Sequence, residues 1–225
     1  MGVLVVSIRL LTLMLTGWCV LTSGGSVQAE SARQRSAEVD LVARFKEVER
    51  DPTLSEALLK TGQKTAAVCA NCHGQGGHSL KPEIPNLAGQ NPAYLIEQLR
   101  RFADGRRRFE FMEGMIKAMS SDEKIGIVLF YASQTVTPRP AANTALAAKG
   151  KDYFSKVCSS CHGEDGHGKE AIPRIASQQP TYLRTTLQHY RAGSGGRVEP
   201  RMLASTRQMS DADIDAVVAY VGSLK

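Results

Sequence analysis

Apolar residues recur at helical spacing in two segments, near residues 125 and 214 of the chain. In each segment four of them occupy positions i, i+3, i+4 and i+7: Ile125, Val128, Leu129 and Ala132 in the first, and Ile214, Val217, Val218 and Val221 in the second. This spacing places all four side chains on one face of an α-helix. Ser210 and Asp213 form an acidic capping box before the second helix. Because no stretch of useful length alternates between apolar and polar residues, the pattern predicts an all-α protein.

Two pairs of earlier segments follow the same helical rhythm. Pro92 and Pro180 stand where a helix is expected to begin, because proline is favoured at the first helical position. Apolar residues at i, i+4 and i+7 follow each proline: Leu95, Leu99 and Phe102 after the first, and Leu183, Leu187 and Tyr190 after the second. Helices are also expected over residues 54–68 and 145–157, so the pattern predicts a chain of two helical halves.

The two halves repeat one sequence. Residues 84–95, Ile-Pro-Asn-Leu-Ala-Gly-Gln-Asn-Pro-Ala-Tyr-Leu, align with residues 172–183, Ile-Pro-Arg-Ile-Ala-Ser-Gln-Gln-Pro-Thr-Tyr-Leu. A period near 89 residues is that of a duplicated domain rather than of a solenoid. The expected organisation is a leader at 1–29, a charged arm at 30–53, a first domain at 54–136, a linker at 137–144 and a second domain at 145–225.

The first 29 residues are read as a cleavable secretory signal peptide. One positive charge, Arg9, precedes a mostly apolar run of 12 residues, and Val27-Gln28-Ala29 has the small-x-small form of a cleavage site. The run is too short to span a bilayer, although residues 2–21 could span one if Arg9 were tolerated. Export to the periplasm is therefore expected, with an uncleaved anchor that faces the periplasm as the alternative.

Composition and charge narrow the class of partner. The chain has 225 residues, 42% hydrophobic and 22% charged, as in a globular protein, and a formal net charge of only +6. Its sharpest positive cluster is residues 100–108, which contain five arginines. This cluster is either a solvated helix end or a docking patch for an acidic partner or an anionic lipid surface, the last allowing peripheral membrane association. Export argues against nucleic acid as a partner.

Two copies of Cys-x-x-Cys-His carry the candidate chemistry. They are Cys69, Cys72 and His73 in the first half, and Cys158, Cys161 and His162 in the second, 89 residues further on. This is the attachment signature of a c-type haem, in which both thiols become thioethers and the adjacent histidine binds the iron. We therefore predict two covalent haems c per chain. A buried porphyrin also supplements the core of a chain with 6% aromatic residues.

Other roles for these cysteines fit less well. An oxidising compartment would allow two disulfides, and a Cys-x-x-Cys pair alone could be a redox dithiol. The histidine directly after each pair favours haem over both. Two Cys-Cys-His sets from separate blocks do not make one tetrahedral zinc site. The fifth cysteine, Cys19, lies in the predicted leader behind Trp18, so a lipid anchor is not expected there.

A methionine group in each half offers the second axial ligand of each iron. The group comprises Met112, Met115 and Met119 in the first half, and Met202 and Met209 in the second. A thioether is a soft ligand, and His/Met coordination raises the haem potential relative to two histidines. Met202 lies eight residues before Ser210, and Met112 lies eight before Ser120 and nine before Ser121. Because the loop length is uncertain by one residue, Met115 is the alternative in the first half. The alternative is that these methionines only fill the core.

Two prolines repeat after the haem motifs. Pro85 and Pro173 follow the haem histidines by 12 and 11 residues. A proline carbonyl at this place could accept the other ring N–H of the histidine and fix the orientation of the ring.

Two further pairs of residues repeat beside each motif. His78 and His167 follow the haem histidines by five residues in glycine-rich loops. Solvated loop residues are the default for this setting, with tuning of the haem edge or metal binding as the alternative. Tyr94 and Tyr182 could reach haem propionates or could only pack in the core.

With these motifs the chain resembles the dihaem cytochromes c4, which consist of two class I cytochrome c domains. The resemblance covers about residues 54–225 and is carried by both Cys-x-x-Cys-His motifs, the segments 84–90 and 172–178, the Met-x-x-Met group and the Ser-Asp starts of the final helices. It implies two tandem class I domains, each wrapped around one covalent haem, with Met112 and Met202 as axial ligands and the Pro85 and Pro173 carbonyls as histidine partners. The chain departs from the family pattern in its extra arm at 30–50 and in lacking a second methionine soon after Met202.

The resemblance implies an electron carrier in a bacterial respiratory chain, with partners such as a terminal oxidase or a quinol–cytochrome c reductase. A dihaem peroxidase needs an iron with an open position, and a thiosulfate-oxidising cytochrome would be expected to use a cysteine ligand. Each iron has a methionine candidate and no cysteine is left over outside the leader. No catalytic residue is therefore expected, while a role as the cytochrome subunit of a larger dehydrogenase or oxidase complex stays open.

Overall fold

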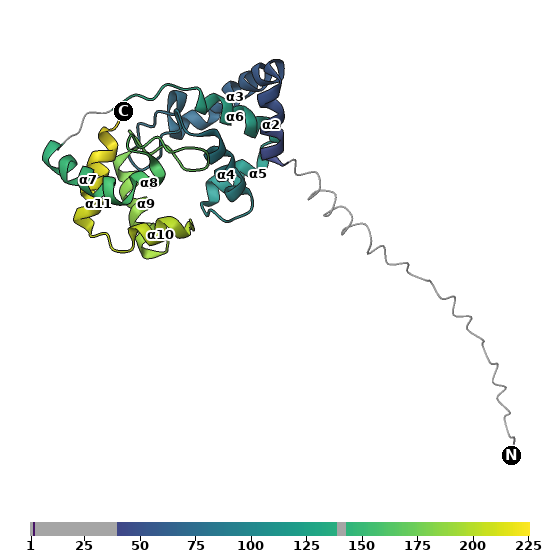
Figure 1. The fold of residues 1–225 in the computed structure, drawn as a ribbon. Helices are drawn as coiled ribbons and strands as arrows, with labels where there is room; N and C mark the ends of the chain where they lie inside the picture. The colour runs from purple at the N-terminus through teal and green to yellow at the C-terminus, as the bar shows by residue number, and fades with distance from the viewer. Residues whose placement is uncertain (1, 3–39, 139–142) are drawn as a thin grey trace. The chain divides into compact units, whose positions relative to one another are not determined.

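The computed structural model describes residues 40–138 and 143–225, together with the isolated Gly2, and is mostly helical (Figure 1). The predicted leader, apart from Gly2, lies outside the described residues, as do residues 30–39 of the predicted arm and 139–142 of the predicted linker. Within the described ranges, β-type pairing is limited to two isolated bridges, Arg107 with Arg197 and Lys169 with Ile172. The expected all-α class is therefore confirmed. None of the helices in these ranges is long and apolar enough to cross a membrane.

The helices follow one another in the order of the repeat. They are α2 (Leu41–Arg50), α3 (Pro52–His73), the 3-10 helix η1 (Gln75–Gly77), α4 (Pro92–Ala103), α5 (Glu110–Ala118), α6 (Ser121–Ala132), α7 (Thr144–Val157), α8 (Ser159–His162), α9 (Pro180–Ala192), α10 (Pro200–Thr206) and α11 (Asp211–Ser223). The two halves repeat the same helices. Helix α3 corresponds to α7 together with α8, α4 to α9, α5 to α10, and α6 to α11.

Local sequence explains where the principal helices begin. Helices α4 and α9 start at the two predicted prolines. Helices α6 and α11 start with capping boxes, in which the hydroxyls of Ser120 and Ser210 accept from the N–H groups of Glu123 and Asp213 at 3.2 and 3.1 Å. The apolar pattern does not reveal α5 and α10, because helices of 9 and 7 residues are too short to establish a period.

In each half the first and last long helices cross in close backbone contact. Helix α3 meets α6 at Gly62 and Gly126, and α7 meets α11 at Gly150 and Ala216; the members of each pair lie side by side in Figure 1. A Cβ atom on any of the three glycines would collide with backbone of the opposite helix. The missing side chains therefore permit the crossing, at some cost in the conformational entropy of each glycine.

One hydrophobic cluster forms the centre of each half. The first is assembled from α2, α3, α4, α5 and α6, and the second mainly from α7, α9 and α11. The faces predicted for the two final helices supply Ile125 and Val128 to the first cluster, and Ile214, Val217 and Val221 to the second. Full burial of each such side chain stabilises the fold by about 1.5–3 kcal/mol. The predicted core faces of α6 and α11 are thereby confirmed.

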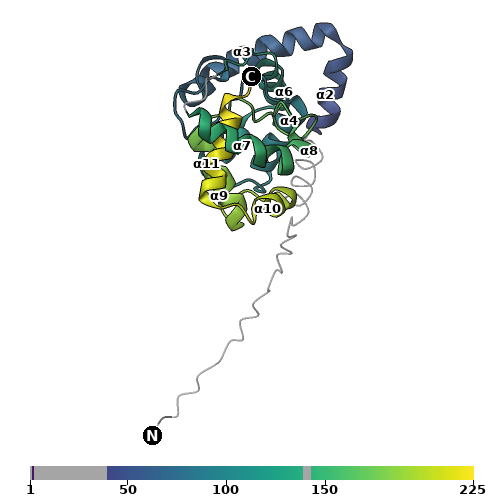
Figure 2. The same cartoon turned by 60° about the vertical axis from the view of Figure 1, so that its left-hand side comes forward.

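Residues 41–50 of the predicted arm form α2, which packs on the first half (Figure 2). Leu41 and Val48 are buried in the first hydrophobic cluster. The Arg44 guanidinium donates to the Asp122 carboxylate at the start of α6, at 2.9 Å. Asp51 then caps α3, whose first residue is the next one along the chain. This part of the arm therefore belongs to the packed first half.

Two glutamines at equivalent positions of the repeat join the halves. The side-chain amide of Gln90 accepts from the N–H of Arg174 at 2.8 Å and donates to its carbonyl at 2.9 Å. The amide of Gln178 does the same with Asn86, at 2.7 and 3.0 Å. Each glutamine thus satisfies both backbone polar groups of a residue in the other half. Four reciprocal hydrogen bonds hold the loop of one half against the loop of the other.

The next residue after each glutamine adds to the same contact. The side-chain amide of Asn91 donates to the carbonyls of His167 and Ile172, at 3.0 and 2.6 Å. In the other direction, the side-chain amide of Gln179 donates to the Ser79 carbonyl. Gln179 is only 1% exposed, so these bonds are shielded from water. The halves therefore meet through a buried polar interface built from the repeated segment.

Candidate haem sites

Each Cys-x-x-Cys-His motif lies at the end of a helix. The motif residues are Cys69, Cys72 and His73 in the last turn of α3, and Cys158, Cys161 and His162 where α7 ends and in the short α8. In the first half, the spacing i, i+3 and i+4 puts the two thiols and the imidazole on one helix face. Gly74 and Gly163 follow the histidines with φ of 74° and 76°, a conformation suited to glycine that ends the helix.

The loop after each motif turns back over the histidine in the same way. The carbonyl of Gly77 accepts from the N–H of Leu87 at 2.8 Å, and the carbonyl of Gly166 accepts from the N–H of Ile175 at 2.8 Å. Both glycines have positive φ, at 82° and 71°. These closures return the chain to the end of the haem helix, although the two loops differ by one residue in length.

The returning loops bring the predicted prolines against the haem histidines. Nδ1 of His73 lies 2.9 Å from the Pro85 carbonyl, and Nδ1 of His162 lies 3.1 Å from the Pro173 carbonyl. A carbonyl only accepts, so Nδ1 must carry the hydrogen in both rings. Burial lowers the pKa of both histidines below the usual value, which favours the neutral ring. Nε2 of each ring is left with the lone pair that a metal ligand needs.

The four motif cysteines are free thiols in the structure. Burial raises the pKa of Cys69, and it raises the pKa of Cys158 to about 11. A reactive dithiol needs a lowered pKa, so these environments do not suit disulfide exchange. Paired thiols on a helix end, beside a neutral histidine with a free Nε2, do fit covalent attachment of a haem.

The structure aligns the methionines of the two halves more closely than the sequence does. Met112 is the third residue of α5, and Met202 is the third residue of α10. Each also follows the bridged arginine of its half, Arg107 or Arg197, by five residues. Met115 corresponds in this register to a serine. Because Ser120 and Ser210 cap the two final helices, Met112 and Met202 each lie eight residues before the cap, so the one-residue uncertainty of the sequence does not persist in the structure.

The other two methionines have a structural role. Met119 and Met209 each directly precede the serine that caps the final helix. Met209 is 4% exposed and lies in the second hydrophobic cluster, and Met119 packs against the first. An apolar residue at this place packs back onto the helix that follows.

His78 and His167 fasten their loops to the chain that follows the final helix of each half. Nε2 of His78 lies 2.9 Å from the Thr135 carbonyl, and Nε2 of His167 lies 2.6 Å from the Lys225 carbonyl. Among the described residues, no group of three or more His, Cys, Asp or Glu side chains is placed to hold a metal ion. The contacts agree with a loop role for the two histidines.

The arginine cluster at 100–108 is largely engaged within the protein. Arg101 pairs with Glu97 of its own helix at 2.7 Å and with Glu199 of the second half at 3.3 Å. Arg106 pairs with Glu97 and with Asp104. Arg100, Arg106 and Arg108 stay exposed, so a solvated helix end and a docking patch both remain predictions for this cluster.

Sequence reasoning missed most residues that connect the halves. Gln90 and Gln178 were noted only as members of a repeated segment, and Arg197 was not singled out at all. The signal for the glutamines was the repeat itself, which places Gln90 opposite Gln178. Arg197 had no such signal, because the period of 89 residues places it opposite Arg108, and only the structure pairs it with Arg107. An interface between the halves could have been suspected from this recurrence, because a polar glutamine occupies the same position of the repeat in both halves.

Comparison with known proteins adds independent evidence. The Cytochrome c family profile matches residues 147–225. The chain is 35% identical over 187 residues to cytochrome c4 of Thiocapsa roseopersicina, covering 77% of this chain and 93% of that protein. It is 31% identical over 171 residues to a thiosulfate dehydrogenase electron acceptor of Thiomonas intermedia, covering 70% and 79%. The structure is similar to reduced cytochrome c4 from Pseudomonas stutzeri, with a TM-score of 0.68, 28% identity, and coverage of 74% and 98%.

The family profile matches the second half alone, whereas the likenesses to the cytochromes c4 cover about three quarters of the chain and so extend over both halves. They agree with the geometry of the motifs, because the fold is that of two class I cytochrome c domains in tandem and each Cys-x-x-Cys-His motif accounts for one covalent haem. The protein is thus a c-type cytochrome with two haems c, of the electron-carrier kind. The chain belongs to the cytochrome c4 family.

Proposed function

We propose that this protein is a periplasmic carrier that passes electrons between respiratory partners, from a quinol–cytochrome c reductase or a similar donor towards a terminal oxidase. The observation that carries the proposal is the duplication of one complete histidine site, joined by reciprocal hydrogen bonds of Gln90 and Gln178. Two redox sites at a fixed separation suit a relay, in which one domain accepts an electron and the other delivers it.

The same proposal assigns the ligands. His73 and His162 bind the irons through Nε2, while the Pro85 and Pro173 carbonyls hold the rings in place. Met112 and Met202 supply the second axial ligands, a choice supported by their shared position in α5 and α10. Bound haem iron supplies reversible one-electron chemistry. A methionine sulfur ligand gives the haem a higher reduction potential than a second histidine does. We place the two repeated haem domains at 54–136 and 145–225, with α2 packed on the first of them.

A second candidate is that the chain accepts electrons from a dehydrogenase. The relative in Thiomonas intermedia is named as the electron acceptor of a thiosulfate dehydrogenase and matches most of this chain. The chain itself is not proposed as the dehydrogenase, since the four motif cysteines are the only ones among the described residues and are taken up by haem attachment.

The proposed location rests on residues 1–29, which the sequence predicts to be a signal peptide for export to the periplasm, where the proposed partners act. The N-terminal sequence of the protein purified from a bacterial host checks this. A start directly after Ala29 agrees with cleavage, while a start at Met1 in the membrane fraction favours the anchor.

The functional test measures electron exchange. The reduced holoprotein should be reoxidised rapidly by membranes that contain a terminal oxidase, and the oxidised form should be reduced by a quinol–cytochrome c reductase or, for the second candidate, by a thiosulfate dehydrogenase. The holoprotein alone should not turn over peroxide or thiosulfate. Enzyme-like turnover of either compound by the purified chain would contradict the carrier function.

A further inference from the structure

Tyr131 is a buried tyrosine near the end of α6 whose hydroxyl lacks a partner. Its side chain is 2% exposed and belongs to the first hydrophobic cluster. The ring packs on the loop that follows the first haem motif, because a Cβ atom added at Gly77 would lie 2.9 Å from Cδ1 of Tyr131. The hydroxyl is also buried, and it makes no hydrogen bond with the described residues. A buried polar group without a partner is unfavourable, so a bound group that supplies an acceptor is expected beside it.

The thiol of Cys69 lies beside this hydroxyl. Cys69 packs against the same hydrophobic cluster as Tyr131. Burial raises the pKa of Tyr131, and the neighbouring Cys69 thiol, as a charge and as a hydrogen-bonding group, raises it further. The Tyr131 hydroxyl in turn lowers the pKa of Cys69, against the larger effect of burial. The two groups are therefore neighbours, although they do not form a hydrogen bond of ordinary geometry while the cysteine is a free thiol.

Attachment of a haem changes what the Cys69 sulfur can do. The free thiol donates to the Thr65 carbonyl at 3.7 Å. In a thioether the hydrogen is replaced by a bond to the porphyrin, so the sulfur can only accept, as the Tyr131 hydroxyl requires. The vinyl groups that form thioethers lie at the opposite edge of a haem from its propionates. The acceptor that a bound haem brings next to Tyr131 is therefore the sulfur and not a carboxylate.

The second half has no such hydroxyl at the equivalent place, which Val221 occupies. The carbonyl of Tyr131 accepts from the N–H of Gly89 at 2.9 Å, and the carbonyl of Val221 accepts from the N–H of Ser177 at 3.1 Å. Gly89 and Ser177 hold the same position of the repeat, directly before the two interface glutamines. Val221 is 1% exposed and has an apolar side chain. The two haem sites therefore differ here, with a phenol in the first half and an alkyl group in the second.

We propose that Tyr131 tunes the first haem alone: its hydroxyl donates a hydrogen bond to the thioether sulfur of Cys69 and thereby raises the reduction potential of that haem. A donor at the sulfur draws electron density away from the attached porphyrin, which favours the reduced iron. Hydrogen bonds around the cofactor are one of the means by which a protein sets a haem potential. With Val221 in the second half, this contact makes two repeated sites unequal. The proposal rests on covalent haem at Cys69 and not on the identity of the redox partners.

The test measures the reduction potentials of both haems in the holoprotein. Tyr131→Phe removes the hydroxyl and keeps the ring that packs on Gly77. It should lower the potential of the first haem and leave that of the second unaltered, whereas a ring that serves packing alone would move neither. NMR signals of the two haems, assigned through their contacts with residues of each half, identify which potential has shifted.

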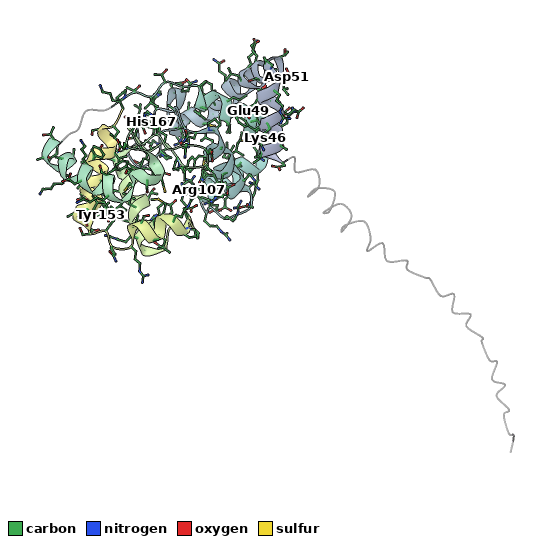
Figure 3. All side chains as sticks on the ribbon, viewed as in Figure 1. Lys46, Glu49, Asp51, Arg107, Tyr153 and His167 are labelled. Carbon is green, nitrogen blue, oxygen red and sulfur yellow. The ribbon has the colours of Figure 1, made fainter. Side chains whose placement is uncertain are left out.

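The matched control removes a phenol hydroxyl from the second half. Tyr153 lies on α7 (Figure 3) and is half-buried, and Cys158 acts on its pKa through charge alone, after burial and Asp213. Tyr153→Phe should leave both potentials close to those of the unaltered protein, because no hydrogen bond to a thioether sulfur is lost. The proposal is overturned if Tyr131→Phe raises the first potential, shifts both equally, or shifts neither by more than this control.

A double-mutant cycle tests the sulfur as the acceptor. Cys69→Ala removes it and leaves the first haem attached through Cys72. In this background Tyr131→Phe should no longer lower the potential, and a shift as large as in the unaltered protein would overturn the proposal.

If Cys69→Ala does not mature with haem, a crystal structure of the unaltered holoprotein decides. A Tyr131 hydroxyl within hydrogen-bond distance of the Cys69 sulfur supports the proposal, and a hydroxyl bound to water or to a backbone carbonyl instead overturns it. Exchange rates with partners test the carrier function separately. A lowered first potential in Tyr131→Phe, with no exchange by the unaltered protein, would reject the carrier alone, whereas rapid exchange with unshifted potentials would reject the role of Tyr131 alone.

Discussion

At the scale of single residues, each haem site depends on one carbonyl placed by a loop. The Pro85 and Pro173 carbonyls determine which nitrogen of His73 and His162 carries the hydrogen, and so which nitrogen can bind iron. The sequence predicted both pairs from spacing alone, and the structure confirms that the carbonyls reach the rings. The distal side is different, because the sequence predicted Met112 with Met115 as the alternative, and the shared position of Met112 and Met202 in α5 and α10 supports Met112.

The choice of distal ligand leads to a prediction about one side chain. Met112→Ala should convert one haem of the two to a high-spin state and lower its potential, because the soft sulfur ligand is lost. The oxidised spectrum should keep about half of its weak methionine–iron band, contributed by the second half. The measurement is absorption spectroscopy with a redox titration of the holoprotein.

Met115→Ala is the matched control, since Met115 lies one turn along the same helix. This variant should keep two low-spin haems. Loss of the band in Met115→Ala, with an unaltered spectrum for Met112→Ala, would move the first axial ligand to Met115.

At the scale of elements, the two capping boxes and the glycine crossings determine how each half closes around its site. The final helices pack on the haem helices, so their N-terminal caps fix where the apolar faces begin. The cap of α11 and the apolar faces were visible in the sequence because capping and apolar spacing are local, whereas the glycine crossings appeared only in the structure. Helices α5 and α10 were not visible, because they are too short to establish an apolar period, and they pack on α4 and α9 of their own halves.

The cap of α11 predicts a stability change with a defined pH dependence. Ser210→Ala removes the hydroxyl that caps the helix and should lower the free energy of unfolding by about 1 kcal/mol at neutral pH. The hydrogen bonds from the Ser210 side chain and backbone lower the pKa of Asp213 below 3.8. The contribution of this carboxylate is therefore present above pH 4 and is lost as the pH falls through its lowered pKa.

The measurement is urea unfolding of the holoprotein at pH 7 and at progressively lower pH. The difference between the unaltered protein and Ser210→Ala should shrink in acid. Ser223→Ala, at the other end of the same helix, serves as the control and should change stability by less. A difference that grows in acid would contradict the assigned role of the carboxylate.

At the scale of the whole described molecule, the buried polar interface joins two similar sites. Gln90 and Gln178 each satisfy both backbone groups of a residue across the interface. Removing either leaves a buried N–H and a buried carbonyl without their partners, which costs about 1–3 kcal/mol for each group. The two sites keep a constant separation for as long as these bonds persist.

The interface predicts that electron transfer between the haems depends on the glutamines. Gln90→Ala and Gln178→Ala should each destabilise the holoprotein and slow the internal transfer measured after flash reduction, because looser domains vary in separation. Both haem potentials should change little. Gln63→Ala, an exposed glutamine on α3, is the control and should leave stability and rate unaltered. Unaltered transfer rates in both interface variants would show that the bonds are not needed to hold the haems.

The haem content of the whole chain is a further prediction. Mass spectrometry of protein matured in a bacterial periplasm should give the polypeptide mass plus two haems, and acid–acetone should extract neither. In Cys158→Ala the second haem should be lost or held by one thioether while the first stays intact. Loss of both haems from this variant would indicate that the halves do not mature independently.

The sequence alone determined what depends on neighbours along the chain. The helices that begin at prolines and capping boxes, the apolar faces of the final helices, the duplicated repeat and the haem attachment residues are all set by short spacings, because helical periodicity and thioether attachment act over a few residues. What only the tertiary structure decided involves residues far apart. Helix register pairs Met112 with Met202, Gln90 and Gln178 cross between halves, and the bridge of Arg107 with Arg197 joins two like charges that no local pattern would place together. These contacts form only when two folded halves pack together. The free energy of that packing depends on residues of both halves, so no single segment determines it.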